Sequence, residues 1–370
     1  MAPSVDDVPT LTDGTVTLRR HLEADVTGVV EQSNDPLSQR WTTVPLNYGT
    51  EDAKRFIRDI MPGGWATDLE WGFAVDVEGR YAGTVSLRNA HDARAEIAFG
   101  SHPWVRGTGH MTSALRLLLD WGFADRDLQT VIWWANRGNW ASRKVAWRLG
   151  FSFDGMVRSW LPHRGVLTDA WTGTLLRGDS REPRHPWRQT PVLTGETVTL
   201  RPLRDTDVPR IVEACADPDT STWLGRMPSP YSSTEAIGWL EECNANAATG
   251  RAATWAVADP GSDQLLGAVN LFDFVTGQEA EVGYWTHPEA RGRGVASEAC
   301  RLVLQHAFDD LGLRRVRAMA AVENTASRQV LERCGMSQWG VEPTGIQIRS
   351  GWVDAACYDV RADDEAWLER

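Results

Sequence analysis

The feature that most constrains this chain is an internal repeat. Three segments of the first half recur in the second: TVTLR of 15–19 at 197–201, AEIAFGSHPWVRGTG of 95–109 as AEVGYWTHPEARGRG at 280–294, and NWASRKV of 139–145 as NTASRQV at 324–330. The offset is 182 residues for the first pair and 185 for the other two. A nearly constant offset, with small differences in the intervening loops, indicates a duplicated domain rather than three chance matches.

The repeat also sets the domain organisation. A chain of 370 residues is longer than one hydrophobic core usually supports. Between the copies lies GDSREPRHPWRQTP at 178–191, whose Pro, Arg and polar residues are typical of a linker. We therefore predict an N-terminal domain over 1–178, a linker over 179–191 and a C-terminal domain over 192–370.

Each copy has the same predicted order of elements. The TVTLR strand leads to a helix that we expect Asp25 or Asp207 to cap. A second helix, three alternating strands, a long helix, a short strand, a short helix and terminal strands follow. The ranges are, for the helices, 51–61, 109–124 and 140–149 (233–248, 294–311 and 325–334 in the second copy) and, for the strands, 71–77, 81–88, 94–100 and 129–135 (255–259, 264–272, 279–286 and 314–320). This order predicts an α+β fold with a mostly antiparallel sheet flanked by helices.

Composition and charge exclude several classes of protein. Apolar residues make up 42% of the chain and charged residues 24%, as in ordinary globular proteins, and no apolar run reaches the roughly 18 residues of a membrane span. The net charge of −12 argues against binding to nucleic acid or anionic lipid. The five cysteines lack metal-ligand spacing, so we predict no metal site. The N-terminus does not read as a signal peptide, and we expect a cytoplasmic protein.

The clearest chemical signal is a glycine-rich turn that follows a strand and opens a helix in both copies. The two loops are Arg106-Gly107-Thr108-Gly109-His110-Met111 and Arg291-Gly292-Arg293-Gly294-Val295-Ala296. Glycines let the backbone turn tightly and approach a ligand, so that successive N–H groups and the positive end of the helix dipole face an anion. The arginines add formal charge. The pattern predicts two phosphate-binding sites.

These loops resemble the R/Q-x-x-G-x-G/A pyrophosphate loop of the GNAT acetyltransferases, and the flanking EVGYWTHP and N-x-x-S-R-x-V segments resemble the subgroup that acetylates the N-termini of ribosomal proteins. The resemblance implies acetyl-CoA as cofactor, with Asn139 and Asn324 beside it. It also implies that the strand before each loop splays from the next parallel strand, and that the pantetheine arm lies in the resulting cleft.

Transfer of an acyl group to a neutral amine needs a base for the amine proton and a proton for the leaving thiolate. The tyrosine that supplies this proton in many relatives is replaced by Ala146 and Leu331. The resemblance instead implies Ser142 and Ser327; the alternative is that these serines are first-turn residues bonded to backbone, with the preceding asparagines as caps.

Fewer residues of the sequence indicate the base than indicate the group that protonates the thiolate. A glutamate of the resembling subgroup is replaced by Leu161 and Ile346, and another found in some relatives is replaced by Trp134 and Met319. Glu96 and Glu281, on the splayed strand, remain as bases acting directly or through water. The alternative is that they are strand-edge carboxylates that only hydrogen-bond a neighbour.

The copies differ where acyl group and acceptor should meet. The first has Trp133 and Trp134, of which strand alternation places one on the cleft side; Met319 stands at the second position in the other copy, and we assign Trp285 to its substrate pocket. The tryptophan either narrows the first cleft and disables it or forms a wall for a particular substrate.

We therefore predict an acyl-CoA-dependent N-acyltransferase, most simply acetyl-CoA dependent. Its partner is an amine acceptor: a peptide or protein N-terminus, or a small molecule. The more regular second loop favours the second copy as the active one. The alternatives are an enzyme that modifies a natural product or antibiotic, and a non-catalytic acyl-CoA-binding sensor. The oligomeric state is left open.

Overall fold

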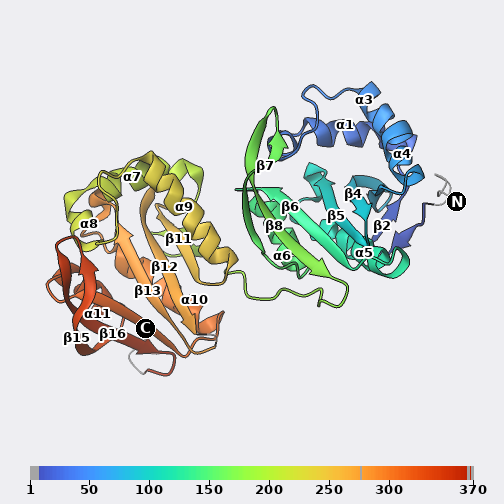
Figure 1. Cartoon of the computed structure of the whole chain (residues 1–370). Coiled ribbons are helices and arrows are strands. Elements are labelled where there is room, and N and C mark those ends of the chain that lie inside the picture. Colours follow the sequence, from blue (N-terminus) through green and yellow to red (C-terminus); the bar gives the residue numbers. More distant parts are fainter. Residues whose placement is uncertain (1–7, 276, 365–366, 368–370) are drawn as a thin grey trace. The chain divides into compact units, whose positions relative to one another are not determined.

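A computed structural model describes residues 8–275, 277–364 and 367 of the chain. The chain divides into two compact units between Arg184 and His185, inside the segment assigned to the linker. Each unit is an α+β domain built on one eight-stranded sheet, as predicted. Figure 1 shows the N-terminal unit in blue to green and the C-terminal unit in yellow to red.

The N-terminal unit has the sheet order β1-β2-β3-β4-β5-β6-β8-β7. Its strands are β1 (Leu11–Thr12), β2 (Val16–Arg19), β3 (Glu70–Val77), β4 (Arg80–His91), β5 (Arg94–Ser101), β6 (Thr130–Asn136), β7 (Gly155–His163) and β8 (Val166–Leu176). Its helices are α1 (Val26–Asn34), α2 (Pro36–Trp41), α3 (Thr50–Arg55), α4 (Met61–Ala66), α5 (His110–Asp125) and α6 (Trp140–Arg148).

The C-terminal unit repeats this arrangement with the order β9-β10-β11-β12-β13-β14-β16-β15. Its strands are β9 (Leu193–Thr194), β10 (Thr199–Pro202), β11 (Ala252–Ala258), β12 (Leu265–Val275), β13 (Glu279–Thr286), β14 (Arg315–Ala321), β15 (Ser337–Ile348) and β16 (Gly351–Arg361). Its helices are α7 (Val208–Ala216), α8 (Pro218–Trp223), α9 (Ser233–Ala248), α10 (Val295–Asp309) and α11 (Thr325–Arg333).

Helices cover both faces of each sheet because successive strand residues point to opposite sides. On β11, Trp255 and Val257 belong to the core that includes residues of α10, whereas Ala256 packs with Ile211 of α7 and Leu240 of α9. The N-terminal sheet is divided in the same way between α5 on one face and α1 and α3 on the other.

The strand pair next to each loop splays, as predicted. All other neighbouring strands are antiparallel, whereas β13 and β14 are parallel and pair only over 279–281 with 315–317. In the N-terminal unit β5 and β6 pair only over 94–97 with 130–133. Both β5 and β13 continue beyond their last pair, so the sheet opens toward the loop at the end of each strand.

Asp25 and Asp207 do not cap α1 and α7 in the expected way; each carboxylate instead accepts the backbone N–H three residues before it, that of Leu22 or Arg204. Neither carboxylate accepts a bond from the helix that follows it. Asp207 instead forms a buried ion pair with Arg201 on β10, at 2.7 Å, and accepts the N–H of Arg204 at 2.8 Å. Asp25 makes the equivalent pair with Arg19. A buried guanidinium needs a charged partner, and this need takes precedence over a cap.

Within the described ranges, no helix has both the length and the apolar character that crossing a membrane requires. The same ranges bring together no group of three or more potential metal-binding side chains.

Candidate active site

The glycine loops have the geometry of an anion cradle in both units. Gly292 and Gly294 have φ of +71° and +79°, and their counterparts Gly107 and Gly109 have +79° and +92°. A Cβ built at any of the four would meet no atom within 4 Å, so each loop is open as well as left-handed. Helices α10 and α5 begin directly after the second glycine, and their first-turn N–H groups lack partners within the helix.

The third, fifth and sixth positions of the loop differ between the copies. Arg293 is exposed, whereas Thr108 donates its hydroxyl to the carbonyl of Val105 at 2.7 Å and contacts the His110 ring at 2.8 Å. Val295 and Met111 are buried in the cores, and Ala296 lines the cavity described below. Only the C-terminal loop therefore combines open glycines with a solvent-facing cation at this position.

The first arginine of each loop turns away from the glycines. Arg291 pairs with Asp217 at the start of α8 and donates to the Thr220 hydroxyl at 2.7 Å. Arg106 pairs with Asp35 at 2.6 Å, at the start of α2. We expected these two arginines to contribute positive charge at the phosphate site, but both are paired with carboxylates instead.

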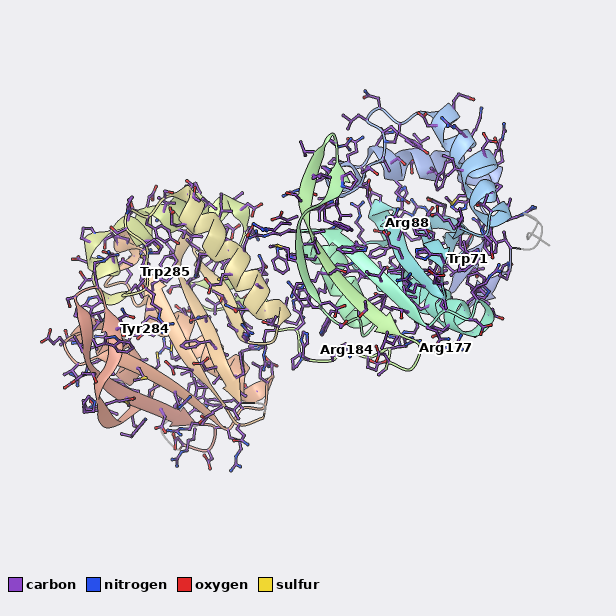
Figure 2. The ribbon with its side chains drawn as sticks, viewed as in Figure 1. Trp71, Arg88, Arg177, Arg184, Tyr284 and Trp285 are labelled. Atoms are coloured by element: carbon purple, nitrogen blue, oxygen red, sulfur yellow. The ribbon has the colours of Figure 1, made fainter. Side chains whose placement is uncertain are left out.

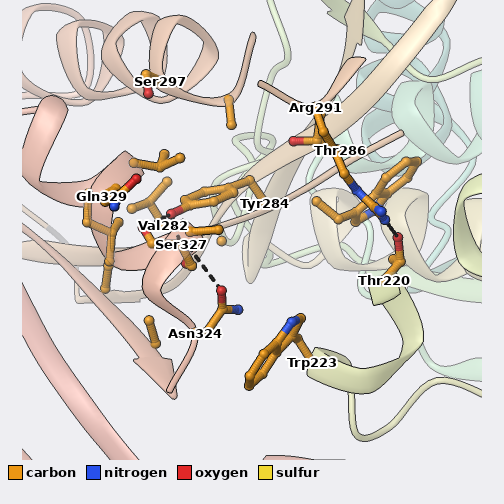
Figure 3. A pocket seen from close by; sticks show the side chains of 18 of the residues that line it. Thr220, Trp223, Val282, Tyr284, Thr286, Arg291, Ser297, Asn324, Ser327 and Gln329 are labelled. Carbon is orange, nitrogen blue, oxygen red and sulfur yellow. Dashed lines mark hydrogen bonds between the residues drawn. The ribbon is translucent and has the colours of Figure 1, made fainter. Parts of the chain in front are cut away.

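A cavity of about 800 Å³ occupies the splay of the C-terminal sheet. Its lining includes the loop glycines, the edges of β13 and β14, the start of α11 and the end of α8. Figure 3 shows Tyr284, Asn324 and Ser327 on one side of it, and Trp223 and Arg291 on the other. The cavity therefore passes through the gap between β13 and β14, and residues on both faces of the sheet line it next to the glycine loop.

On the face covered by α10 and α11, the cavity contains a pair of hydroxyls. The Tyr284 hydroxyl lies 3.0 Å from Ser327 Oγ and 3.0 Å from the Ser327 carbonyl oxygen. The Asn324 side chain accepts the Ser327 N–H at 3.1 Å, so the asparagine caps α11 and leaves the serine hydroxyl to Tyr284. Burial raises the pKa of Tyr284 far above its usual range.

Tyr284 is not among the residues predicted from the sequence, because the tyrosine of many relatives corresponds to Ala146 in α6 and Leu331 in α11. The available signal was the difference between Tyr284 and Phe99 at matching positions of the repeat. Tyr284 and Trp285 are successive residues of β13 (Figure 2), so Tyr284 packs with the α10 core and Trp285 with the α7–α9 core.

On the opposite face of the sheet, the carboxylate of Glu281 lies near several apolar side chains that also line the cavity. Glu281 is directly opposite Phe272 of β12 in the sheet register, and both line the cavity with Trp285, Met319 and Ile346. Burial raises the pKa of Glu281; the nearby Arg317 opposes this shift, and Asp273 adds to it. A carboxyl with a raised pKa is suited to accepting a proton near neutral pH.

Comparison with known families agrees with this geometry. The family model described as "Acetyltransferase (GNAT) domain" matches residues 15–152 and again residues 197–337. The chain belongs to the GNAT acetyltransferase family. The predicted family is thereby confirmed for both halves.

Several GNAT relatives are similar over part of the chain. "Probable N-acetyltransferase YjcK" of Bacillus subtilis is 36% identical over 94 residues, which are 25% of this chain and 52% of that protein. The chain thus spans about half the length of this relative. "Uncharacterized N-acetyltransferase YoaA" of the same organism is 28% identical over 152 residues, 41% of this chain and 85% of that protein. The structure of Mycobacterium smegmatis RimJ in complex with CoA-disulfide aligns with a TM-score of 0.44 and 22% identity, covering 50% of this chain and 94% of that one.

The N-terminal GNAT domain has the matching glutamate in a different environment. Glu96 pairs with Arg88 and accepts the Asn89 side-chain N–H at 3.0 Å; Arg88 is labelled in Figure 2. By register, Arg88 stands opposite Glu96 as Phe272 stands opposite Glu281. The carboxylate of this copy is therefore engaged by a charged partner, whereas Glu281 has an apolar ring at the matching position.

The splay of the N-terminal GNAT domain also contains a larger side chain. Trp133 takes the place of Ala318 and is only 1% exposed. Its indole N–H donates to Ser142 Oγ at 3.0 Å, while Asn139 caps α6 by accepting the Ser142 N–H at 3.2 Å. The indole of Trp133 thus occupies the space next to Ser142, and its N–H engages the serine hydroxyl that we expected to face the cleft.

Trp134 points to the other face of β6, since adjacent strand residues alternate. Its ring lies 5.7 Å from the exposed Trp160 ring of β7. The structure therefore separates the two tryptophans: Trp133 lies on the serine side of the sheet, and Trp134 lies on the side that corresponds to Met319.

Proposed function

We propose that the C-terminal GNAT domain transfers an acyl group, most simply acetyl, from a coenzyme A thioester to a primary amine. The observation that supports this most strongly is the cavity through the splay, since it joins the glycine loop, the Ser327–Tyr284 pair and Glu281. A transferase of this kind needs its donor-binding groups and its two proton-handling groups in one space.

The residues fit coenzyme A by their chemistry. Open glycines and first-turn amides of α10 suit a diphosphate. A second hollow of about 820 Å³ beside the loop is lined by Arg293, Arg301 and Arg333 and also by Glu196 and Glu298. Its three arginines suit the phosphate on the ribose. When bound, the thioester supplies an acyl group activated for transfer.

The proton-handling residues follow from their surroundings. Glu281 takes the proton of the attacking amine, since its raised pKa brings it closer to that of a base working near neutral pH. Ser327 passes its hydroxyl proton to the departing sulfur, which leaves as the free thiol, and takes a proton back from water. Tyr284 positions the serine hydroxyl and does not itself ionise, because burial makes a tyrosinate costly.

The acceptor is the amine of a peptide or protein N-terminus, or of a small molecule. The N-terminal GNAT domain is a non-catalytic half in this proposal, supported by the Arg88–Glu96 ion pair and by the buried Trp133.

Release of free thiol from acetyl-CoA, measured with and without a panel of primary amines, tests the proposal. We expect thiol release that depends on the amine. Saturable binding of acetyl-CoA by calorimetry, with no release for any amine of the panel, would instead support a non-catalytic acyl-CoA sensor.

The serine hydroxyl provides a first prediction. Ser327→Ala is expected to lower kcat by about ten- to a thousandfold, toward the lower end of what general acid–base catalysis contributes, with nearly unchanged affinity for coenzyme A. Calorimetry and steady-state kinetics measure the two quantities. Tyr284→Phe is the milder variant and should lower kcat less, because the hydroxyl of Ser327 is kept. Normal turnover in Ser327→Ala would contradict the assignment.

The filled splay of the N-terminal GNAT domain provides a second prediction. Trp133→Ala should lower the free energy of unfolding of that domain by about 3–5 kcal/mol, as for other large buried aromatic residues. Trp134→Ala is the matched control, since this neighbouring ring is only half-buried. Urea denaturation monitored on the whole chain compares the two, and equal losses would contradict the orientation described here.

A further inference from the structure

Helix α8 forms one wall of the C-terminal cavity. Thr222, Trp223 and the following Leu224 line it, and Figure 3 places Trp223 at the end of α8, next to the cavity. Phe272 and Trp285 on the sheet line the same cavity. A six-residue helix has little stability of its own, so its position depends on what fastens it.

The first fastening joins α8 to the glycine loop. Asp217 accepts the Thr220 N–H at 2.9 Å as the N-cap of α8, and the same carboxylate oxygen pairs with Arg291. Arg291 also donates to Thr220 Oγ1 and reaches Asp219 at 3.3 Å. One guanidinium at the start of the loop thus holds the first turn of the helix.

The second fastening joins α8 to the turn between β15 and β16. The Arg349 side chain donates to the carbonyl of Ser221 at 3.1 Å and to that of Met227 at 3.2 Å. Its backbone N–H donates to the carbonyl of Thr222 at 3.0 Å. Carbonyls of the last helical turn lack intrahelical partners, and this arginine satisfies two of them.

The same two fastenings recur in the N-terminal unit. Arg106 pairs with Asp35 and donates to Ser38 Oγ at 3.2 Å. Arg164, at the turn between β7 and β8, donates to the carbonyl of Gln39 at 2.7 Å. The two domains differ in the partners of their glutamates and at Trp133, where the second copy has Ala318, yet both have this clamp on the helix. The clamp therefore belongs to the fold that both copies share.

We propose that α8 is the acceptor wall of the C-terminal site, that Trp223 selects an amine with an apolar substituent, and that Arg291 positions this wall rather than binding phosphate. The inference rests on the proposed function and names its acceptor class. The cavity that contains Glu281 is lined by the polar side chains of Asp219 and Thr222 and by a larger apolar set: Trp223, Leu224, Phe272, Trp285, Met319 and Ile346. An apolar substituent gains affinity there by leaving water, while Glu281 faces the amine.

Arg291 and Arg293 form a matched pair of variants within one loop. Arg291→Gln is expected to raise the KM for the acceptor by about tenfold, the loss of one charge-assisted bond, with an unchanged Kd for acetyl-CoA in calorimetry. Arg293→Gln should do the reverse, weakening acetyl-CoA and sparing the acceptor KM. A weaker Kd in Arg291→Gln equal to that of Arg293→Gln would overturn the positioning role.

Two further measurements separate positioning from general damage to the fold. Hydrogen exchange of the α8 amides in the ligand-free protein should speed up in Arg291→Gln, and exchange in α10 should not. Arg291→Lys should have an acceptor KM between those of the wild type and Arg291→Gln, since a lysine can still pair with Asp217. Arg349→Gln, at the other end of α8, should show the same acceptor defect. Unchanged α8 exchange in both glutamine variants would overturn the clamp.

Acceptor selection is tested with phenylalaninamide and glycinamide, which differ only in the apolar substituent beside the α-amine. We expect a lower KM for phenylalaninamide, and Trp223→Ala should remove most of the difference. A preference for glycinamide, no turnover of phenylalaninamide, or a preference unchanged in Trp223→Ala would overturn the selection. If wild-type protein fails to bind acetyl-CoA in calorimetry, the proposed function itself is wrong.

Discussion

Gly294→Asp is expected to abolish acyl transfer by the whole chain. The position has φ of +79° and open space around it, and aspartate tolerates this conformation better than most residues, so the fold should survive. The new carboxylate would face the diphosphate at the positive end of α10. We expect acetyl-CoA affinity at this site to fall by about a hundredfold or more, because several charge-assisted bonds are lost together.

Gly109→Asp is the matched control, with the same chemistry at the same point of the N-terminal loop, where φ is +92°. Turnover should survive in this variant, because the N-terminal copy has Trp133 in its splay and Glu96 paired with Arg88. Steady-state thiol release measures both variants. Loss of turnover in Gly109→Asp with retention in Gly294→Asp would assign catalysis to the other domain.

Glu281→Gln is expected to lower kcat/KM by about a hundred- to ten-thousandfold, the range for loss of a general base. In the wild type, activity should rise with pH through the raised pKa of this carboxyl, because the base works when ionised. Glu96→Gln, the matched variant, should leave turnover nearly unchanged. A normal rate and an unshifted pH profile in Glu281→Gln would contradict the role.

Stability distinguishes a base from a structural carboxylate. A raised pKa in the folded state means that the folded protein holds this proton more tightly than the unfolded chain. The carboxyl therefore supports folding at low pH, and this support is lost as pH rises through the raised pKa. At neutral pH Glu281→Gln should be as stable as the wild type or more so, even as activity falls. A large loss of stability would indicate a structural role.

The features that depend on residues close together in the sequence could be predicted from the sequence. The glycine loops and their strand–turn–helix context follow from residue types that favour few conformations. The asparagine caps at 139 and 324, which were the alternative to a role beside the cofactor, follow from the same local chemistry. The repeat then predicted two copies of one α+β fold. The pairing of Arg291 could not be predicted, because its partner Asp217 is 74 residues away and a loop arginine reads equally well as a phosphate ligand.

The sequence also could not predict which face of the sheet a given strand side chain points to. Alternation predicts that Trp133 and Trp134 face opposite sides of the sheet, but their absolute direction depends on strand register. The bond from Trp133 to Ser142 settles that direction in the structure. Tyr284 was missed for a related reason: its hydroxyl reaches Ser327 across the splay, and sequence spacing carries no information on that contact.

A crystal structure of the chain grown with acetyl-CoA tests the central claim most directly. We predict the diphosphate on the backbone amides that follow Gly292, and the sulfur within hydrogen-bonding reach of Ser327, with the acyl carbon facing the Glu281 side of the splay. Acetyl-CoA bound only in the N-terminal domain, or a thioester held away from both Ser327 and Glu281, would contradict the account.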